Sequence, residues 1–170
     1  MNFAELAARR YSCRSFTNKP VEKEKIDQIL EAGRIAPTAS NCQPQMIKVC
    51  TDRKKIENIE NHTDCHYNAP LAIFCCYDET KCWSRPADGH KSGEVDTAIV
   101  AIHMILQAFD LGIGSTWVGV FNPEMVKEMC NLPKTYVPVA ILMLGYPDTV
   151  DGGPADHHYV RKPIQSMLLN

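Results

Sequence analysis

Apolar residues recur at helical spacing in three stretches of the chain. The first covers residues 2–10, and the second covers residues 21–35, where Pro37 ends the helix because proline disfavours a helical conformation in the residue before it. Residues 94–111 show the strongest pattern, a broad apolar stripe that ends at Gly112. The positions that define these faces are Phe3, Leu6 and Ala7, then Ile26, Ile29, Leu30 and Gly33, and then Ala98, Ile102, Ile105, Leu106 and Phe109. The pattern predicts three amphipathic helices.

Four other stretches have the pattern of β-strands, and they cover residues 46–51, 69–77, 115–121 and 137–146. Residues 69–77 are apolar throughout, which is typical of a strand covered on both faces. The polar residues 52–60 and the segment between Pro123 and Pro133 predict two further helices. Helices and strands alternate without a repeat or a low-complexity linker. The pattern therefore predicts a single α/β or α+β domain with a mixed sheet over residues 1–170.

The composition narrows the class of protein. A chain of 170 residues with 45% hydrophobic and 22% charged residues is typical of one globular domain. Its net charge of −2 argues against a nucleic-acid-binding protein and against a polybasic membrane anchor. No apolar run approaches the roughly 18 residues that span a bilayer, and the first ten residues do not resemble a secretory signal. We therefore expect neither a nucleic-acid partner nor a membrane partner.

Eight cysteines raise the questions of disulfides and metals: Cys13, Cys42, Cys50, Cys65, Cys75, Cys76, Cys82 and Cys130. Disulfide frameworks belong mainly to small secreted domains, and this chain shows no secretory signal. It has no C-x-x-C pair, and the adjacent Cys75 and Cys76 would point to opposite faces of a strand. We expect reduced thiols that pack in the core, no metal site and a cytoplasmic location.

The first candidate for chemistry is the sequence Arg10-Tyr11-Ser12-Cys13-Arg14, directly after the first predicted helix. In an extended segment the side chains of Arg10, Ser12 and Arg14 point the same way. Two guanidinium groups and a hydroxyl suit a phosphate, because each guanidinium donates two parallel hydrogen bonds. A solvated cluster that complements the helix dipole explains the same residues, and spacing alone does not exclude it.

Two further segments offer binding groups. Residues 36–45 carry the amides of Asn41 and Gln43 between two prolines, which suits the edge of a heterocyclic ring, although an ordinary turn has the same composition. Residues 112–121 place three glycines around Trp117, so that a flat group could approach the backbone closely. A helix end followed by a core strand is the alternative interpretation of that segment.

Together these segments resemble the nitroreductase family of FMN-dependent oxidoreductases. The resemblance rests on R-x-S-x-R at residues 10–14, A-P-T-x-x-N-x-Q-P at 36–44, L-G-x-G-S-x-W at 111–117, G-Y-P at 145–147 and R-K-P at 161–163. No single motif is specific, but their order and spacing are, over nearly the whole chain. The resemblance implies an α+β fold, in which helices flank a mixed, mostly antiparallel sheet. It also implies an intertwined homodimer with two FMN sites in its interface.

The resemblance also assigns roles to residues. Arg10, Ser12 and Arg14 would bind the FMN phosphate, ribityl chain and pyrimidine edge, and Arg161 would add a second contact to the phosphate. Residues 37–43 would line the ring from the other subunit, and the strand around Trp117 would present backbone groups to it. The candidate cofactor-binding residues are Arg10, Tyr11, Ser12, Arg14, Pro37, Thr38, Ala39, Asn41, Gln43, Trp117, Val118, Gly119 and Arg161.

Two positions depart from the family pattern. Tyr159 stands where a lysine is common, and Gln45 stands where an aromatic residue commonly follows Gln-Pro. The polar segment 78–93 is a candidate lid, in which Trp83 could cover the flavin. The tail, residues 147–170, is expected to reach the FMN phosphate and the partner subunit, with His157 and His158 in solvent.

The activity implied by the resemblance is the transfer of reducing equivalents from NAD(P)H through the flavin N5 to an acceptor. The acceptor would be a nitroaromatic, a quinone or a flavin, and the two half-reactions would follow a ping-pong order. The flavin carries the chemistry, so no catalytic side chain is expected. The alternatives are an FMN-binding carrier or sensor with negligible turnover, and another flavin chemistry such as reductive dehalogenation or flavin fragmentation.

Overall fold

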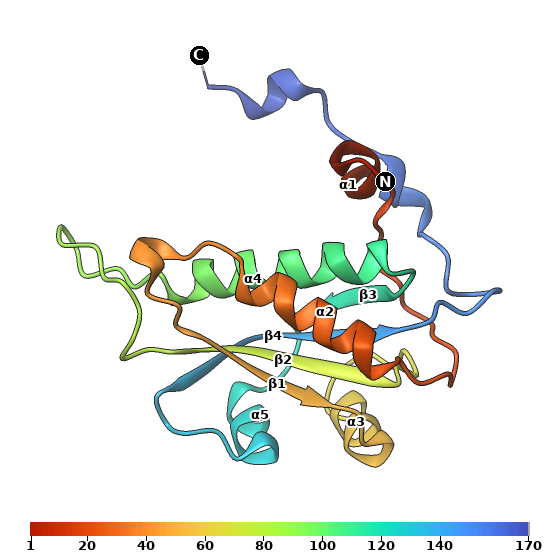
Figure 1. The fold of residues 1–170 in the computed structure, drawn as a ribbon, viewed down its shortest axis with the longest axis horizontal. Coiled ribbons are helices and arrows are strands. Elements are labelled where there is room, and N and C mark those ends of the chain that lie inside the picture. The colour runs from red at the N-terminus through yellow and green to blue at the C-terminus, as the bar shows by residue number, and fades with distance from the viewer. Residues whose placement is uncertain (170) are drawn as a thin grey trace.

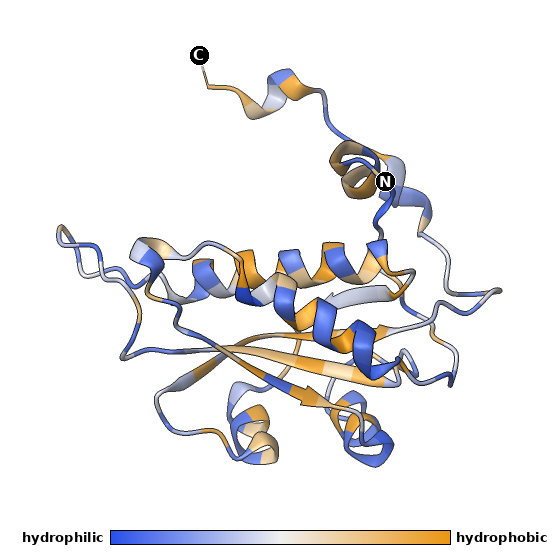
Figure 2. Cartoon of the chain, viewed as in Figure 1, coloured by the Kyte–Doolittle hydropathy of each residue, from blue (hydrophilic) through white to orange (hydrophobic). Residues whose placement is uncertain are grey.

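The computed structural model describes residues 1–169 and contains a four-stranded sheet in the order β1-β2-β4-β3, with every neighbouring pair antiparallel (Figure 1). The strands are β1 (Gln45–Cys50), β2 (Leu71–Asp78), β3 (Gly114–Val118) and β4 (Tyr136–Gly145). Most residues of the central strands β2 and β4 are buried and hydrophobic (Figure 2). This burial confirms the prediction that residues 69–77 form a strand covered on both faces.

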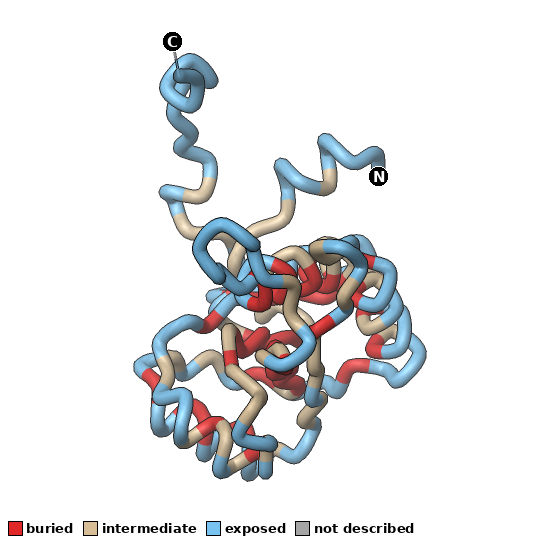
Figure 3. The backbone as a smooth tube through the Cα atoms, turned by 90° about the vertical axis from the view of Figure 1, so that its left-hand side faces the viewer, coloured by how far each residue is buried: buried red, intermediate tan, exposed pale blue. Residues whose placement is uncertain are grey.

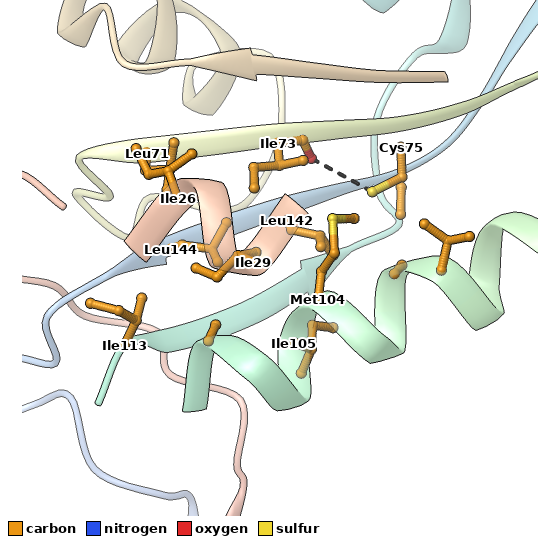
Figure 4. Close-up of a cluster of buried hydrophobic side chains, with 14 of the residues drawn as sticks. Ile26, Ile29, Leu71, Ile73, Cys75, Met104, Ile105, Ile113, Leu142 and Leu144 are labelled. Atoms are coloured by element: carbon orange, nitrogen blue, oxygen red, sulfur yellow. Dashed lines mark hydrogen bonds between the residues drawn. The ribbon is translucent and has the colours of Figure 1, made fainter. Parts of the chain in front are cut away.

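One face of the sheet packs against α2 (Lys23–Arg34) and α4 (Gly93–Asp110). Figure 4 shows this core, in which Ile29 and Met104 lie against Leu142 and neighbouring strand residues. Gly33 allows the two helices to approach closely, since a Cβ at this position would lie 2.9 Å from Met104 Cγ. Burying a side chain such as Ile29 contributes about 1.5–3 kcal/mol.

The other face is covered by α3 (Arg53–Glu60) and α5 (Pro123–Cys130), where Ile56, Ile59 and Val126 pack against Phe74 and Met143. Both helices begin as their sequences predict. The Asp52 and Asn122 side chains accept hydrogen bonds from the first backbone N–H groups of α3 and α5, which have no partner within the helix. Helices on both faces of an antiparallel sheet give an α+β fold, as predicted.

The two ends of the chain project from this body (Figures 1 and 3). Helix α1 (Phe3–Arg9) buries none of its residues, and Phe3 is 73% exposed. The C-terminal segment carries two short 3₁₀ helices, η2 (Asp156–Tyr159) and η3 (Ile164–Met167), and exposes Ile164 and Met167. The apolar face predicted for the first helix therefore stays uncovered within one chain.

Two details differ from the sequence pattern. Strand β3 ends at Val118, three residues before the predicted end, because its pairing with β4 stops there. Ile102 belongs to the apolar stripe predicted for residues 94–111, yet it is 41% exposed. Helix α4 is apolar on more than one face, and the face that it buries in the core runs through Val100, Ala101, Met104 and Ala108.

Residues 83–92 form a hydrogen-bonded hairpin that extends beyond the end of the sheet (Figure 1). Ser92 N donates to Trp83 O over 2.9 Å, and Arg85 N donates to His90 O over 2.9 Å. The Arg85 guanidinium also holds both oxygens of Asp88, over 2.8 and 2.7 Å. The segment that composition marked as a loop therefore has a defined conformation of its own.

Within residues 1–169 no helix combines the length and the apolar character needed to cross a bilayer. The same part of the chain contains no group of three or more His, Cys, Asp or Glu side chains arranged to hold a metal ion. All eight cysteines are free thiols.

Candidate functional site

The segment 10–14 is fixed to the open edge of the sheet. Ser12 forms a parallel bridge with Ser115 of β3, and Cys13 N donates to Ser115 O over 3.0 Å. The Cys13 side chain is fully buried, while Arg14 is exposed on the other side of the segment. Gly114 makes this approach possible, because a Cβ there would lie 2.9 Å from Cys13 Cβ. The alternation that predicted Arg10, Ser12 and Arg14 on one side is thereby fixed by backbone pairing.

Arg10, Arg14, Arg161 and Ser12 form a positively charged group that we call the arginine cradle. Burial, together with the positive charge of Arg161, lowers the pKa of Arg10, so these two guanidinium groups lie near each other. Among residues 1–169, no carboxylate forms an ion pair with any of the three arginines. Like charges that gather without an acidic partner are typical of an anion site.

A small cavity of about 180 Å³ adjoins the cradle, and its lining consists of Tyr11, Ser12, Arg14, Ala155, His157, His158 and Arg161. The C-terminal segment thus lies against the N-terminal one, with Arg161 and Arg14 on the same cavity. Arg161 is held in place by its own segment, since its Nη1 donates to Val160 O over 2.9 Å and to His158 O. The remaining guanidinium N–H groups are free to bind a ligand.

His158 was expected in solvent, and the structure corrects this. Its ring packs edge-on against Tyr11, with ring centroids 6.2 Å apart, and its Nε2 is buried without a hydrogen-bond partner among the described residues. Tyr11 in turn contacts Phe109 near the C-terminal end of α4, with ring centroids 6.1 Å apart. A buried ring nitrogen without a partner is uncommon and marks a place where a polar ligand group could bind.

The candidate residues of β3 lie on the same edge of the sheet. Trp117 is 39% exposed, whereas the Val118 side chain is buried in the core and leaves only its backbone for a ligand. Gly119 is exposed and follows the last residue of the strand. Edge strands present unpaired backbone groups, so residues 117–119 can offer N–H and C=O groups to a flat ligand.

The 37–43 loop has an unusual backbone. Ser40, Asn41 and Gln43 have φ angles of 49°, 54° and 50°, in the left-handed region that favours glycine. Each such residue costs about 1 kcal/mol, and such strain is concentrated where proteins bind ligands. The loop is closed by Gln43 N, which donates to Thr38 Oγ1 over 3.1 Å. This geometry favours a specific binding loop over the ordinary turn that composition left open.

The 37–43 loop and the arginine cradle lie at opposite ends of α4 (Figure 1). Ala39 N donates to Asp96 Oδ1 over 2.8 Å in the first turns of α4, while Tyr11 contacts Phe109 in the last turn. Phe109 lies thirteen positions after Asp96 in the helix, which corresponds to about 20 Å along its axis. One chain therefore gathers Arg10, Ser12, Arg14 and Arg161 beside the edge strand that leads to residues 117–119, whereas residues 37–43 contact the other end of α4.

The model of the family described as "Nitroreductase family" matches this chain over residues 7–70 and 63–146. The chain belongs to the nitroreductase family.

Solved structures and relatives agree with this assignment. A crystal structure of a nitroreductase family protein from Clostridium difficile superposes with a TM-score of 0.91 and 42% identity, over 99% of this chain and 98% of that one. A second C. difficile structure, described as an FMN-dependent nitroreductase, has a TM-score of 0.76 and 26% identity, over 94% and 98%. A relative from Archaeoglobus fulgidus carries the provisional name NADH dehydrogenase/NAD(P)H nitroreductase. It is 32% identical over 88% of each chain.

Two residues that the sequence interpretation did not assign to the site are prominent in the structure. Asp96 anchors the 37–43 loop from a position 57 residues away, and no local pattern could have revealed that contact. His158 was dismissed because of its polar neighbours, although Ala155 and Tyr159 beside it could have indicated partial burial.

The two departures from the family pattern also have definite positions in the structure. Tyr159 is 73% exposed and packs edge-on against His158, with ring centroids 4.8 Å apart, so it adds no charge to the cradle. Gln45 begins β1, and its Oε1 is buried without a hydrogen-bond partner in the described chain.

Proposed function

We propose that this protein is an FMN-dependent oxidoreductase that takes reducing equivalents from NAD(P)H and passes them to a nitroaromatic, quinone or flavin acceptor in a ping-pong order. The observation that carries the proposal is the arginine cradle, in which the guanidinium groups of Arg14 and Arg161 and the hydroxyl of Ser12 border one cavity, while Arg10 adds a third positive charge that Arg161 affects. The names of the relatives support the cofactor and the reductant, since one is called FMN-dependent and another an NAD(P)H nitroreductase.

The residues present fit FMN. Its phosphate is a dianion. Burial and, to a lesser degree, the charge of Arg161 lower the pKa of Arg10, and a bound phosphate would relieve the repulsion between the two arginines. Ser12 supplies a neutral hydroxyl beside them, and the unpartnered Nε2 of His158 is a further polar group near the same cavity. When bound, FMN supplies the two-electron redox chemistry that no amino-acid side chain provides.

The role of the chain's own residues in this proposal is to bind FMN and to orient it. In this proposal Arg10 and Arg161 hold the phosphate, Ser12 contacts the ribityl chain, and Arg14 lies at the pyrimidine edge. A guanidinium at that edge favours negative charge on a group that gains electrons. Backbone groups of residues 117–119 face the ring from the sheet edge, where Trp117 is partly exposed. No side chain of this set needs to act as a nucleophile or as an acid–base pair.

A second copy of the chain completes the site. Within one chain the 37–43 loop contacts the first turns of α4 and Tyr11 of the 10–14 segment contacts its last turn, about 20 Å further along the helix, which supports a ring site formed with another subunit. An apolar hollow of about 740 Å³ lies between α1, α2 and α4, and its lining includes Phe3, Leu6, Ile35, Ile102 and Leu106. Apolar side chains that one chain leaves exposed are typical of an interface, and we propose an intertwined homodimer.

The surroundings of the site fit the remaining parts of the proposal. The 83–92 hairpin lies next to the 37–43 loop, at the end of α4 that would face the partner's cradle, so it would border the acceptor pocket. We propose that residues 1–170 form one FMN-binding domain whose tail reaches the phosphate and the partner. Eight free thiols support a reducing compartment, the cytoplasm.

The test is spectroscopic. Purified protein, or protein reconstituted with FMN, is expected to be yellow and to bleach with NADH or NADPH under anaerobic conditions. Oxidised colour should return when menadione, a nitrofuran or free FMN is added. Protein that no FMN can reconstitute would overturn the proposal. Tight FMN binding without any stimulated NAD(P)H oxidation would replace the enzyme with the carrier or sensor.

A further inference from the structure

Asp96 is a buried carboxylate that the binding of FMN does not itself explain. Its side chain lies in the first turns of α4 and is 1% exposed, and no cation within residues 1–169 forms an ion pair with it. Its two oxygens have different partners. Oδ1 accepts from Ala39 N over 2.8 Å, and Oδ2 accepts from Ser92 Oγ over 2.7 Å. Burying a carboxyl group is costly unless its oxygens are hydrogen-bonded, so these two donors offset the cost of burying Asp96.

Each partner belongs to a different functional segment. Ala39 lies in the 37–43 loop, and Ser92 is the last residue of the 83–92 hairpin, where its own N–H donates to Trp83 O. These segments are separated by the whole of β1, α3 and β2. Among the hydrogen bonds of the described residues, only those to Asp96 link the two segments.

Tight packing holds the first turn of α4, which carries Asp96, in place. Gly93, three residues before Asp96, packs so tightly against β2 that a Cβ would lie 2.2 Å from the Tyr77 ring and 2.6 Å from Cys82 Sγ. The loop, by contrast, holds Ser40, Asn41 and Gln43 in left-handed conformations that they adopt only under constraint. A fixed acceptor on α4 therefore supplies the constraint that the loop needs.

We propose that Asp96 is a positioning residue that joins the 37–43 loop to the 83–92 hairpin, so that the ring-binding loop and the border of the acceptor pocket keep one fixed geometry. The proposal rests on the proposed function for what these two segments do. The link itself does not depend on that function, because both hydrogen bonds exist within one chain.

The two hydrogen bonds to Asp96, from the Ala39 N–H and the Ser92 hydroxyl, determine which substitutions test its role. Asp96→Ala removes both acceptors and leaves the Ala39 N–H and the Ser92 hydroxyl without a partner. Asp96→Asn keeps the shape, since its carbonyl oxygen can accept from Ala39 N while its amide donates to Ser92 Oγ. Ser92→Ala removes only the contact with the hairpin and leaves the contact with the loop in place.

The experiment is hydrogen–deuterium exchange on the FMN-free protein, followed by titration with FMN. Asp96→Ala is expected to speed exchange in residues 37–43 and 83–92 together, with the sheet unchanged, and to weaken FMN binding about tenfold or more. Asp96→Asn should restore both segments and most of the affinity. Ser92→Ala should speed exchange in the hairpin alone.

The outcomes separate this proposal from the proposed function. If Asp96→Ala leaves both segments as protected as in the parent protein, or if Asp96→Asn behaves like Asp96→Ala, the positioning role is wrong. If Asp96→Ala does not fold, Ser92→Ala decides, and an unchanged hairpin would overturn the link. A parent protein that binds no FMN, with both segments released by Asp96→Ala, would refute the proposed function and leave the link standing.

Discussion

Arg10, Arg14 and Arg161 gather three positive charges, and no carboxylate among residues 1–169 forms an ion pair with any of them. Arg10 is half-buried near Arg161, and the repulsion between their positive charges destabilises the folded chain. A bound dianion converts this repulsion into charge-assisted hydrogen bonds, which are about twice as strong as neutral ones. The arrangement is therefore adapted to a ligand rather than to the stability of the chain alone.

Arg161→Ala is expected to weaken FMN binding about 10- to 100-fold, because it removes charge-assisted hydrogen bonds to the phosphate. The effect should shrink in high salt. Quenching of flavin fluorescence measures the affinity. Arg34→Ala is the matched control, because Arg34 is exposed and both of its hydrogen bonds go to Glu31, each over 2.6 Å. Equal affinities for the two variants would contradict the role of Arg161.

The buried thiols predict an alkaline loss of stability. Burial raises the pKa of Cys76 from 9.0 to about 12, and it raises the pKa of Cys75 further. The unfolded chain ionises these thiols above about pH 9 while the folded chain does not, so the free energy of unfolding falls as the pH rises through that window. Each thiol lowers the free energy of unfolding by up to about 1.4 kcal/mol per pH unit within that window.

Urea unfolding at pH 7 and pH 10 tests this expectation. Cys76→Ala should lose less stability between the two pH values than the parent protein does. Cys42→Ala, at a partly exposed position, should lose as much as the parent. An equal loss in the parent and in Cys76→Ala would show that the Cys76 thiol ionises in the folded state as well.

At the scale of single residues, the sequence predicted features that depend only on neighbouring positions in the chain. Alternation along residues 10–14 is enough to place Arg10, Ser12 and Arg14 on one side of a segment. Asp96 was not predictable, because its partner Ala39 lies 57 residues away and the contact exists only after folding. The burial of His158 depends in the same way on Tyr11, at the other end of the chain.

At the scale of elements, hydrophobic periodicity predicted the four strands and the helices α1, α2 and α4, whereas polarity and flanking prolines predicted α3 and α5. It did not predict which face of α4 packs inward. Apolar residues surround much of that helix, so the pattern does not separate the core face from the face with Ile102. The left-handed residues of the 37–43 loop were also beyond prediction, because glycine, the usual signal, is absent there.

The contact between the segment 10–14 and β3 depends on Gly114. Gly114→Ala would place a Cβ 2.9 Å from both Cys13 Cβ and Pro147 Cγ, atoms that cannot move without the backbone. We expect a loss of about 1–3 kcal/mol of stability, together with weaker FMN binding as the cradle shifts. Thermal unfolding and FMN titration measure the two effects.

Gly153→Ala is the control for this substitution, since a Cβ at position 153 would meet nothing within 4 Å. It should change neither stability nor affinity appreciably. A Gly114→Ala protein with the parent's stability and FMN affinity would show that the segment 10–14 tolerates displacement, and that its pairing with β3 does not position the cradle.

At the scale of the whole molecule, the proposed FMN site is divided between the two ends of α4. The cradle adjoins its C-terminal end and the 37–43 loop its N-terminal end, and the contacted residues Asp96 and Phe109 are about 20 Å apart along the helix. The family resemblance predicted a site shared by two subunits. Hydrophobic pattern and composition could not predict it, because they do not say how far apart two segments lie in the folded chain. The exposed apolar faces of α1 and α4 and the projecting tail provide the surface through which two chains could meet.

Subunit complementation tests this central claim most directly. One variant, Arg10→Ala with Arg161→Ala, damages the cradle, and a second, Asn41→Ala with Gln43→Ala, damages the loop. Each homodimer should bind FMN weakly at both sites. A mixed dimer, isolated through two different tags, combines both defects in one site and leaves the other site intact. It should therefore bind one FMN with the affinity of the parent protein. A mixed dimer that binds FMN as weakly as the two variant homodimers would contradict the shared site. A chain that remains a monomer while binding FMN tightly would contradict it as well.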